Sequence, residues 1–267
     1  MLCNTFSLQA AGHKLRVRSI IPAGLSLQEK PVMIFLHEGL GCIELWRDFP
    51  EILSGTVGLP AMIYDRYGSG GSDPIQEPRN GNPFRREAEE VLPEILSLCG
   101  IEKPILIGHS DGGSIALHYA ALYPDSPVGL IAEAAHVFGE ELTLSSIRKA
   151  VIAFENGDLH SRLAKYHGTQ TESMFRGWAD IWLLPENRSW NMEAVLPDIT
   201  CPVQIIQGED DEYGTMAQVN AIVSGVAGRT ETLIIPDCAH SPHLQAREAT
   251  LAGMAGFIRS LHLSTTS

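Results

Sequence analysis

The chain has 267 residues, of which 44% are hydrophobic, 19% charged and 7% aromatic. This composition is typical of a soluble globular protein and excludes a disordered or fibrous chain, and the length is sufficient for one sizeable core. Lys and Arg number 19 against 32 Asp and Glu, which gives a formal net charge of −13. Because basic residues are few and unclustered, nucleic acid and anionic membranes are poor partners. We expect a small-molecule substrate and a monomer or homodimer.

Cysteine usage and the absence of apolar targeting segments favour the cytoplasm. The five cysteines are widely spaced and form no C-x-x-C pair, so neither a disulfide framework nor a zinc knuckle is indicated. Residues 1–18 hold no apolar stretch of signal-peptide length, and no segment approaches the length of a transmembrane span. We therefore expect a cytoplasmic protein.

Short apolar runs that end in polar clusters alternate with longer helical stretches along the chain. The predicted strands are 31–36, 61–64, 104–108, 128–132, 202–207 and 231–235, and the predicted helices are 85–99, 112–123 and 244–261. This alternation predicts an α/β fold with a mostly parallel central sheet flanked by helices. In such sheets a functional site lies at the carboxyl ends of the strands.

The alternation of predicted strands and helices stops between residues 137 and 196, where short helices are expected. Three of the four tryptophans fall in this segment: Trp178, Trp182 and Trp190. A helical insertion between two strands of one sheet would cover the strand ends as a lid. We therefore predict a core of residues 1–136 and 197–267 with a lid of residues 137–196. Trp178 and Trp182 are predicted to line the substrate pocket, with plain packing on the core as the alternative.

The most specific local motif is Gly108-His109-Ser110-Asp111-Gly112, which follows a predicted strand directly and precedes a helix. A serine in a G-x-S-x-G motif with these neighbours occupies a strained strand-to-helix turn that exposes its hydroxyl above the sheet. A glycine turn without catalytic role is the alternative. We predict that Ser110 is a nucleophile.

A serine hydroxyl needs a base to remove its proton and an acid to orient that base. His240 follows the last predicted strand, whereas its rival His243 is expected to be carried away by a helix that starts at Pro242. The acid is expected among the four consecutive carboxylates of residues 209–212, because one is enough and the others can form a solvated turn. The chain order Ser, Asp, His is the order of α/β-hydrolases.

The other histidines fall into two groups. His109 and His136 follow strands at the same sheet edge, so we expect them to line or support the pocket. The remaining ones lack such a setting and are expected on the surface or in packing: His13, His118, His160, His167 and His262.

With these motifs the chain resembles the α/β-hydrolase superfamily over essentially its whole length. His37-Glu38-Gly39, with Trp46 downstream, is similar to the HG-x oxyanion loop of that family, and residues 64–72 are similar to its D-x-R-G-x-G-x-S turn. The resemblance implies that Asp211 is the acid, with Asp210 as second choice, and that His240 is the catalytic histidine. The lid predicted for residues 137–196 also agrees with this resemblance.

The resemblance further implies an oxyanion hole made by the backbone N–H groups of Gly39, with Leu40 as an alternative, and of Asp111. Two departures from the family pattern affect this loop. Glu38 stands where the family usually has glycine and could tighten, move or electrostatically weaken the loop; we also place it among the pocket residues. The carboxylate of Asp111 would disfavour a developing oxyanion unless it points away.

These features predict a serine hydrolase that cleaves a carboxylic ester or lactone of a small to medium, largely uncharged substrate through an acyl-enzyme, without metal or cofactor. A C–C bond hydrolase of aromatic degradation, a thioesterase and an aminopeptidase use the same triad; the last would need an amine-binding carboxylate such as Glu133, Glu155 or Glu172. An alternative function of another class also stays open: a non-hydrolytic ligand-binding protein or a cofactor-free oxygenase with the α/β-hydrolase fold. Haloalkane dehalogenases and epoxide hydrolases are disfavoured because they carry Asp where Ser110 stands.

Overall fold

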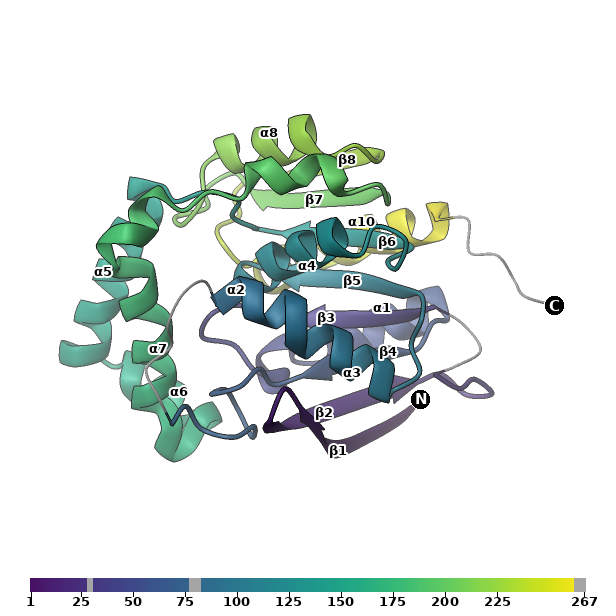
Figure 1. Cartoon of the computed structure of the whole chain (residues 1–267), viewed down its shortest axis with the longest axis horizontal. Coiled ribbons are helices and arrows are strands. Elements are labelled where there is room, and N and C mark those ends of the chain that lie inside the picture. Colours follow the sequence, from purple (N-terminus) through teal and green to yellow (C-terminus); the bar gives the residue numbers. More distant parts are fainter. Residues whose placement is uncertain (28–30, 77–82, 262–267) are drawn as a thin grey trace.

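The computed structural model describes residues 1–27, 31–76 and 83–261, and its centre is an eight-stranded sheet (Figure 1). The strand order is β1-β2-β4-β3-β5-β6-β7-β8. Six strands run parallel: β3 (Val32–Leu36), β4 (Ala61–Tyr64), β5 (Pro104–His109), β6 (Gly129–Glu133), β7 (Val203–Gly208) and β8 (Thr230–Ile235). The predicted α/β fold is confirmed, and the ends of these six strands fall within one residue of the predicted ones.

An N-terminal hairpin adds two strands that the sequence pattern did not predict. Strands β1 (Leu2–Ala10) and β2 (His13–Ile21) pair antiparallel, and β2 continues antiparallel onto β4. Strand β1 lies at the sheet edge and exposes most of its side chains, so its sequence lacks the apolar run that marks the buried strands.

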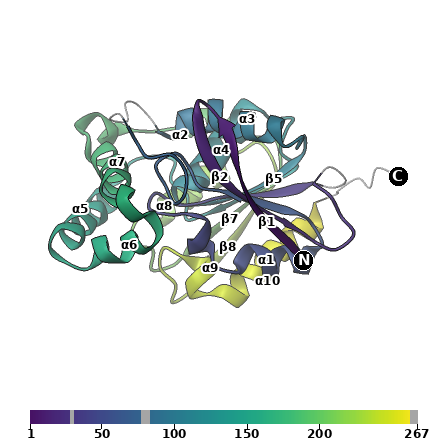
Figure 2. The ribbon, with the colours of Figure 1, turned by 90° about the horizontal axis from the view of Figure 1, so that it is seen from below.

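Helices cover both faces of the sheet (Figure 2). Helices α3 (Leu92–Leu98), α4 (Asp111–Leu122) and α8 (Met216–Gly225) pack in one apolar cluster, and α1 (Phe49–Val57) and α10 (Arg247–Ser260) pack in another. Strands β3, β5, β6 and β7 are buried along their whole length. Burial on two faces explains why these strands are continuous apolar runs rather than alternating ones.

Two predicted helices are interrupted. The first consists of α2 (Pro83–Arg86), a π-helical turn (Glu87–Val91) and α3, all in direct succession. The last is divided into α9 (Pro242–Gln245) and α10, because Ala246 between them leaves the helical conformation, with φ −126° and ψ 48°. None of the described helices combines the length and apolar character needed to cross a membrane.

A helical insertion connects β6 to β7. It contains α5 (Glu141–Asn156), α6 (Leu159–His167) and α7 (Thr171–Leu183), followed by short 3-10 segments. Figure 1 shows these three helices beyond the end of the sheet at which the parallel strands terminate. At the root of the insertion, its outgoing and returning chains meet in an antiparallel bridge between Phe138 and Asn191.

Helix α4 approaches strand β3 so closely that only glycine fits at its second position. A Cβ atom on Gly112 would lie 1.9 Å from the backbone oxygen of Leu36. This approach sets the first turn of α4 against the end of β3, and with it the segment that carries Ser110.

Replacing Gly112 by alanine should therefore lower the free energy of unfolding by about 1–3 kcal/mol, because the backbone of β3 must shift. Gly256, within α10, provides the matched control, since nothing lies within 4 Å of its Cβ position. Gly256→Ala should raise stability by about 0.5–1 kcal/mol through the better helix propensity of alanine. Urea unfolding of both variants tests this, and equal effects of the two substitutions would contradict it.

Candidate active site

Ser110 occupies the sharp turn between β5 and α4. Its backbone has φ 53° and ψ −118°, a conformation that non-glycine residues rarely adopt and that costs about 1–3 kcal/mol. The backbone N–H of Ser110 donates to the carbonyl of Glu133 at the end of β6, with N···O 2.8 Å. The turn thus places the serine at the carboxyl edge of the sheet, where the motif predicted it.

The side chains of Ser110, His240 and Asp211 form a continuous hydrogen-bonded chain. The Oγ of Ser110 lies 2.9 Å from Nε2 of His240, and Nδ1 of His240 lies 2.8 and 2.9 Å from the two carboxylate oxygens of Asp211. Because a carboxylate only accepts, Nδ1 carries the proton and Nε2 is left to accept from the serine hydroxyl. Burial alone would raise the pKa of Asp211, but the hydrogen bond from His240 holds it below its usual value.

Asp211, and not Asp210, faces the histidine. The Asp211 carboxylate is buried and also accepts from the backbone N–H of Tyr213 at 2.7 Å and from the side-chain amide of Gln207 at 2.6 Å. Asp210 is exposed, as is the rest of the acidic run. The four carboxylates therefore divide into one oriented acid and a solvated turn.

The loop after β3 is fixed by neutral His37 and by Arg66. His37 donates from Nδ1 to the carbonyl of Glu38 at 2.7 Å and accepts at Nε2 from the backbone N–H of Arg66 at 3.0 Å. Burial, helped by the charge of Arg66, lowers the pKa of His37 to about 3. The Arg66 guanidinium donates to the same Glu38 carbonyl at 2.7 Å. Within the described residues the N–H groups of Gly39 and Asp111 donate to no other group, so both are available as anion donors.

The side chain of Asp111 has two partners and stays close to the loop after β3, where one of its oxygens would lie 3.0 Å from a Cβ atom on Gly39. One carboxylate oxygen accepts from the indole N–H of Trp182 at 3.3 Å, and the other lies 3.6 Å from the Arg66 guanidinium. This pairing removes the electrostatic objection to an acidic residue next to the nucleophile, because the carboxylate charge is balanced locally.

Helix α7 of the insertion rests on the loop after β3. A Cβ atom on Gly39 would lie 2.1 Å from the indole nitrogen of Trp178, which shows how closely that ring covers the glycine. Trp182 packs edge-on against His136, whose ring is 5.9 Å from that of His240. These predicted pocket residues thus gather around the triad, and their contact with substrate stays a prediction.

His167 was not predicted as a site residue, although it joins the insertion to two loops. It is buried, accepts at Nδ1 from the backbone N–H of Gly70 at 3.0 Å and donates from Nε2 to the carbonyl of Leu40 at 3.1 Å. No sequence motif signals these contacts, because both partners are backbone atoms about a hundred residues away. His262, expected on the surface or in packing, lies outside the described residues.

The three carboxylates considered for amine binding are not free at the triad. Glu133 is fully buried and accepts from the backbone and the ring of His243. Glu155 and Glu172 both pair with Arg176 on the surface of the insertion. Glu155 and Glu172 are thus paired away from the triad, whereas one oxygen of Glu133 has no hydrogen-bond partner among the described residues. Amine binding by any of the three stays a prediction.

Cys42, Glu44 and Asp65 present ligand atoms within 4.8 Å of one another, the spacing of a metal site. The Arg16 guanidinium already pairs with both carboxylates. Burial also raises the pKa of the Cys42 thiol, which opposes the thiolate form that a metal binds. These residues do not fit a metal ion, since the arginine takes the place of the cation.

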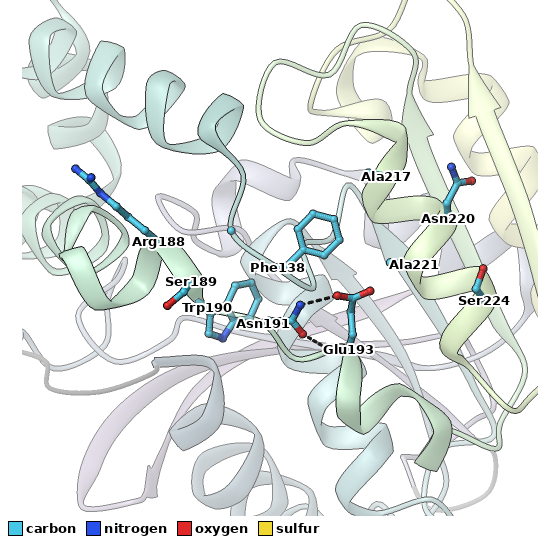
Figure 3. A pocket seen from close by; sticks show the side chains of 11 residues that line it. Phe138, Arg188, Ser189, Trp190, Asn191, Glu193, Ala217, Asn220, Ala221 and Ser224 are labelled. Atoms are coloured by element: carbon cyan, nitrogen blue, oxygen red, sulfur yellow. Dashed lines mark hydrogen bonds between the residues drawn. The ribbon is translucent and has the colours of Figure 1, made fainter.

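A separate hollow of about 690 Å³ lies at the root of the insertion, between the Phe138–Asn191 bridge and helix α8 (Figure 3). Phe138 and Trp190 line one side, and Asn220 on α8 lines the other. None of the triad residues lines it. This hollow is distinct from the site built around Ser110.

Separate replacement of Asp210 and Asp211 by asparagine tests which of the two acids orients His240. Asp211→Asn should slow phosphonylation of Ser110 by a fluorophosphonate about 10⁴-fold, because the amide cannot hold the imidazole in the required tautomer. Asp210→Asn is the matched control and should stay within about twofold, since that side chain is solvated. Rates of gel-based labelling give both values, and similar losses in the two variants would place the orienting acid elsewhere.

A methyl group at position 39 should disrupt the donor at the loop after β3. Gly39→Ala drives Cβ into the Trp178 ring and should lower the labelling rate of Ser110 by about 10²- to 10³-fold, the typical effect of losing one oxyanion donor. The double variant Gly39→Ala/Trp178→Ala relieves the collision and should recover part of the rate. An unaltered rate in the single variant would exclude Gly39 as a donor.

Comparisons with known proteins find relatives in sequence and in fold. Curated relatives include a proline iminopeptidase of Saccharolobus solfataricus, 32% identical over 81 residues, and a bifunctional esterase/perhydrolase of Acinetobacter calcoaceticus, 27% identical over 101 residues. These matches cover 28% and 38% of this chain, and only 24% and 35% of the lengths of those relatives. Among solved structures, the enol-lactonase from Burkholderia xenovorans aligns with a TM-score of 0.75 at 17% identity, over 96% of this chain and 100% of that chain.

The fold agrees with the family comparison. The sequence profile described as "Alpha/beta hydrolase family" matches residues 33–252, which include Ser110, Asp211 and His240. The chain belongs to the alpha/beta hydrolase family.

Proposed function

We propose that this protein is a serine hydrolase that cleaves a carboxylic ester or lactone through an acyl-enzyme. The observation that carries the proposal is the chain Ser110 Oγ, His240 Nε2, His240 Nδ1 and Asp211, with successive distances of 2.9 Å and 2.8 Å, beside two free backbone N–H groups. This is the arrangement that acyl transfer requires: a nucleophile, an oriented base and an anion-binding pair.

In the acylation step the Ser110 oxygen attacks the carbonyl carbon of the ester while its proton passes to Nε2 of His240. Negative charge then develops on the carbonyl oxygen, and we assign its stabilisation to the N–H groups of Gly39 and Asp111. His240 returns the proton to the leaving alcohol, and the C–O bond breaks. Asp211 stays ionised and balances the imidazolium that forms in between.

In the deacylation step water takes the place of the alcohol. His240 removes a proton from water, the resulting hydroxide attacks the acyl carbon, and the bond to Ser110 breaks as the serine regains a proton. The products are a carboxylic acid and a free enzyme. Every step uses side chains and N–H groups of this chain, and none requires a metal or an organic cofactor.

A largely uncharged substrate is favoured because the charges around the triad already have partners. The Asp111 carboxylate is matched by Arg66, and the Glu38 carboxylate lies 3.5 Å from the imidazole of His109. Two of the carboxylates considered for amine binding, Glu155 and Glu172, pair with Arg176 on the surface of the insertion, which supports an ester over a free aminoacyl substrate. The similarity to an esterase/perhydrolase and to an enol-lactonase supports an ester or lactone, whereas the similarity to a proline iminopeptidase supports an aminoacyl substrate.

Ser110→Ala should abolish both fluorophosphonate labelling and turnover of p-nitrophenyl acetate, because the variant lacks the proposed nucleophile. The wild-type protein should be labelled at Ser110, as mapped by peptide mass spectrometry. Ser114→Ala is the matched control. This serine is buried one helical turn further along α4, and its hydroxyl bonds only to backbone groups of Ser110 and His136, so the variant should keep the labelling of Ser110. Turnover that persists in Ser110→Ala would contradict the proposal and favour a non-hydrolytic role for the site.

A panel of substrates distinguishes an ester hydrolase from the other hydrolases that use the same triad. Short-chain esters, aromatic esters, lactones, acyl thioesters, amino-acid amides and ring-cleavage diketones should be assayed on one preparation. We expect kcat/KM to be highest for an ester or lactone. A preference for the diketones, the thioesters or the amides would replace the proposed substrate class while leaving Ser110 as nucleophile.

A further inference from the structure

The proposed reaction does not use the buried imidazole of the residue that precedes the nucleophile. His109 is the last residue of β5, directly before Ser110, and is 2% exposed. Its Nε2 lies 2.8 Å from the backbone carbonyl oxygen of His240. Because a carbonyl only accepts, Nε2 must carry a proton and donate it. His109 therefore holds the backbone of the residue whose ring serves as the base.

The other ring nitrogen of His109 faces the loop after β3. Its Nδ1 lies 3.5 Å from a carboxylate oxygen of Glu38, the residue before Gly39. The contact has ion-pair distance and is not a hydrogen bond, since Nδ1 has no hydrogen-bond partner among the described residues. A carboxylate this close to a buried imidazole favours the protonated ring. Burial alone would lower the pKa of His109, but Glu38 and the buried Glu133 raise it to about 9.

The remaining groups around the ring come from β6, from α9 and from the His240 loop. Glu133 accepts at one oxygen from the backbone N–H and the ring of His243, at 2.7 and 2.9 Å, while its other oxygen has no hydrogen-bond partner among the described residues. The rings of His243 and His240 lie 4.9 and 5.2 Å from that of His109. Two carboxylates thus face His109, and a cation there balances them.

We propose that His109, anchored by the Glu38 carboxylate, is a positioning residue that holds the oxyanion loop and the His240 loop in register with the nucleophile turn. The inference rests on the proposed serine-hydrolase function and adds residues to it. One ring joins three segments: residues 37–41 through Glu38, the turn at Ser110 through the chain itself, and the His240 loop through its carbonyl.

This contact gives a role to Glu38 at a position where the family usually has glycine. A glycine has no carboxylate, so the oxyanion loop would have no charged contact with His109. Gly39, whose N–H we assign to the oxyanion hole, is the next residue after Glu38. A shift of about 1 Å in a catalytic group can lower a rate about 10²-fold, so a contact one residue away affects the reaction without touching substrate.

Glu38→Gln removes the charge and keeps the shape. At neutral pH we expect kcat for p-nitrophenyl acetate to fall about 10- to 100-fold while KM changes little, because the reacting groups lose alignment and the pocket is unchanged. In the wild type, kcat should decline as pH rises through the His109 pKa of about 9, and in the variant this decline should move to lower pH. Glu44→Gln, whose carboxylate pairs with Arg16 and Arg18, should keep both the kcat and the pH profile of the wild type.

Two substitutions of His109 separate positioning from folding. His109→Gln keeps an N–H that can reach the His240 carbonyl but carries no charge, so kcat should be intermediate and the decline near the His109 pKa should disappear. His109→Leu lacks both contacts and should be slower. Thermal melting shows whether each variant is folded, and Glu38→Gln, which replaces a partly exposed side chain, remains informative if the His109 variants unfold.

The outcomes distinguish this proposal from the function on which it rests. A Glu38→Gln protein with wild-type kcat and an unmoved pH profile overturns the positioning role, as does a loss of kcat that leaves the pH profile in place. In either case, inactivity of Ser110→Ala still supports the serine hydrolase. Turnover that survives in Ser110→Ala overturns the function itself.

Discussion

The close approach of helix α4 to the sheet is the constraint on which the site depends. At Gly112 the helix leaves no room for a Cβ atom against the β3 backbone, and Ser110 takes up the resulting tight turn with a positive φ. The conformation costs free energy locally, and the burial of α4 and β5 on the apolar core offsets it. It places the serine oxygen at the sheet edge, next to the loops after β3, β7 and β8.

Local pairing of charge explains how an acidic chain can stabilise an oxyanion. At an effective dielectric constant of 20, two unit charges 4 Å apart interact by about 4 kcal/mol, so one unpaired carboxylate near the serine would largely cancel the benefit of the donors. The carboxylates at this edge are each matched by a cationic or hydrogen-bonding group: Asp111 by Arg66, Glu38 by His109, Glu133 by His243 and Asp211 by His240. The net charge of −13 therefore says little about the potential at the site.

The sequence predicted the buried strands of the sheet but not the exposed strands at its edge. It likewise predicted the residues that lie in recognisable motifs, but not the contacts of the residues that hold the loops around them. Strands buried on both faces are apolar runs, whereas β1 is exposed at the sheet edge and carries no such signal. Ser110, His240 and Asp211 follow strand ends, so topology alone brings them together. The contacts of His167 involve backbone atoms of distant loops, and the direction of the Glu38 side chain depends on packing, so neither was predictable from spacing.

The central claim is that Ser110 forms a covalent acyl intermediate. The most direct measurement is rapid acid quenching during turnover of p-nitrophenyl acetate, followed by mass spectrometry of the intact protein and of its peptides. We expect one acetyl group, located on the peptide that contains Ser110, together with a burst of p-nitrophenol of matching size. Steady hydrolysis with no acyl-protein, or an acetyl group on another residue, would contradict it.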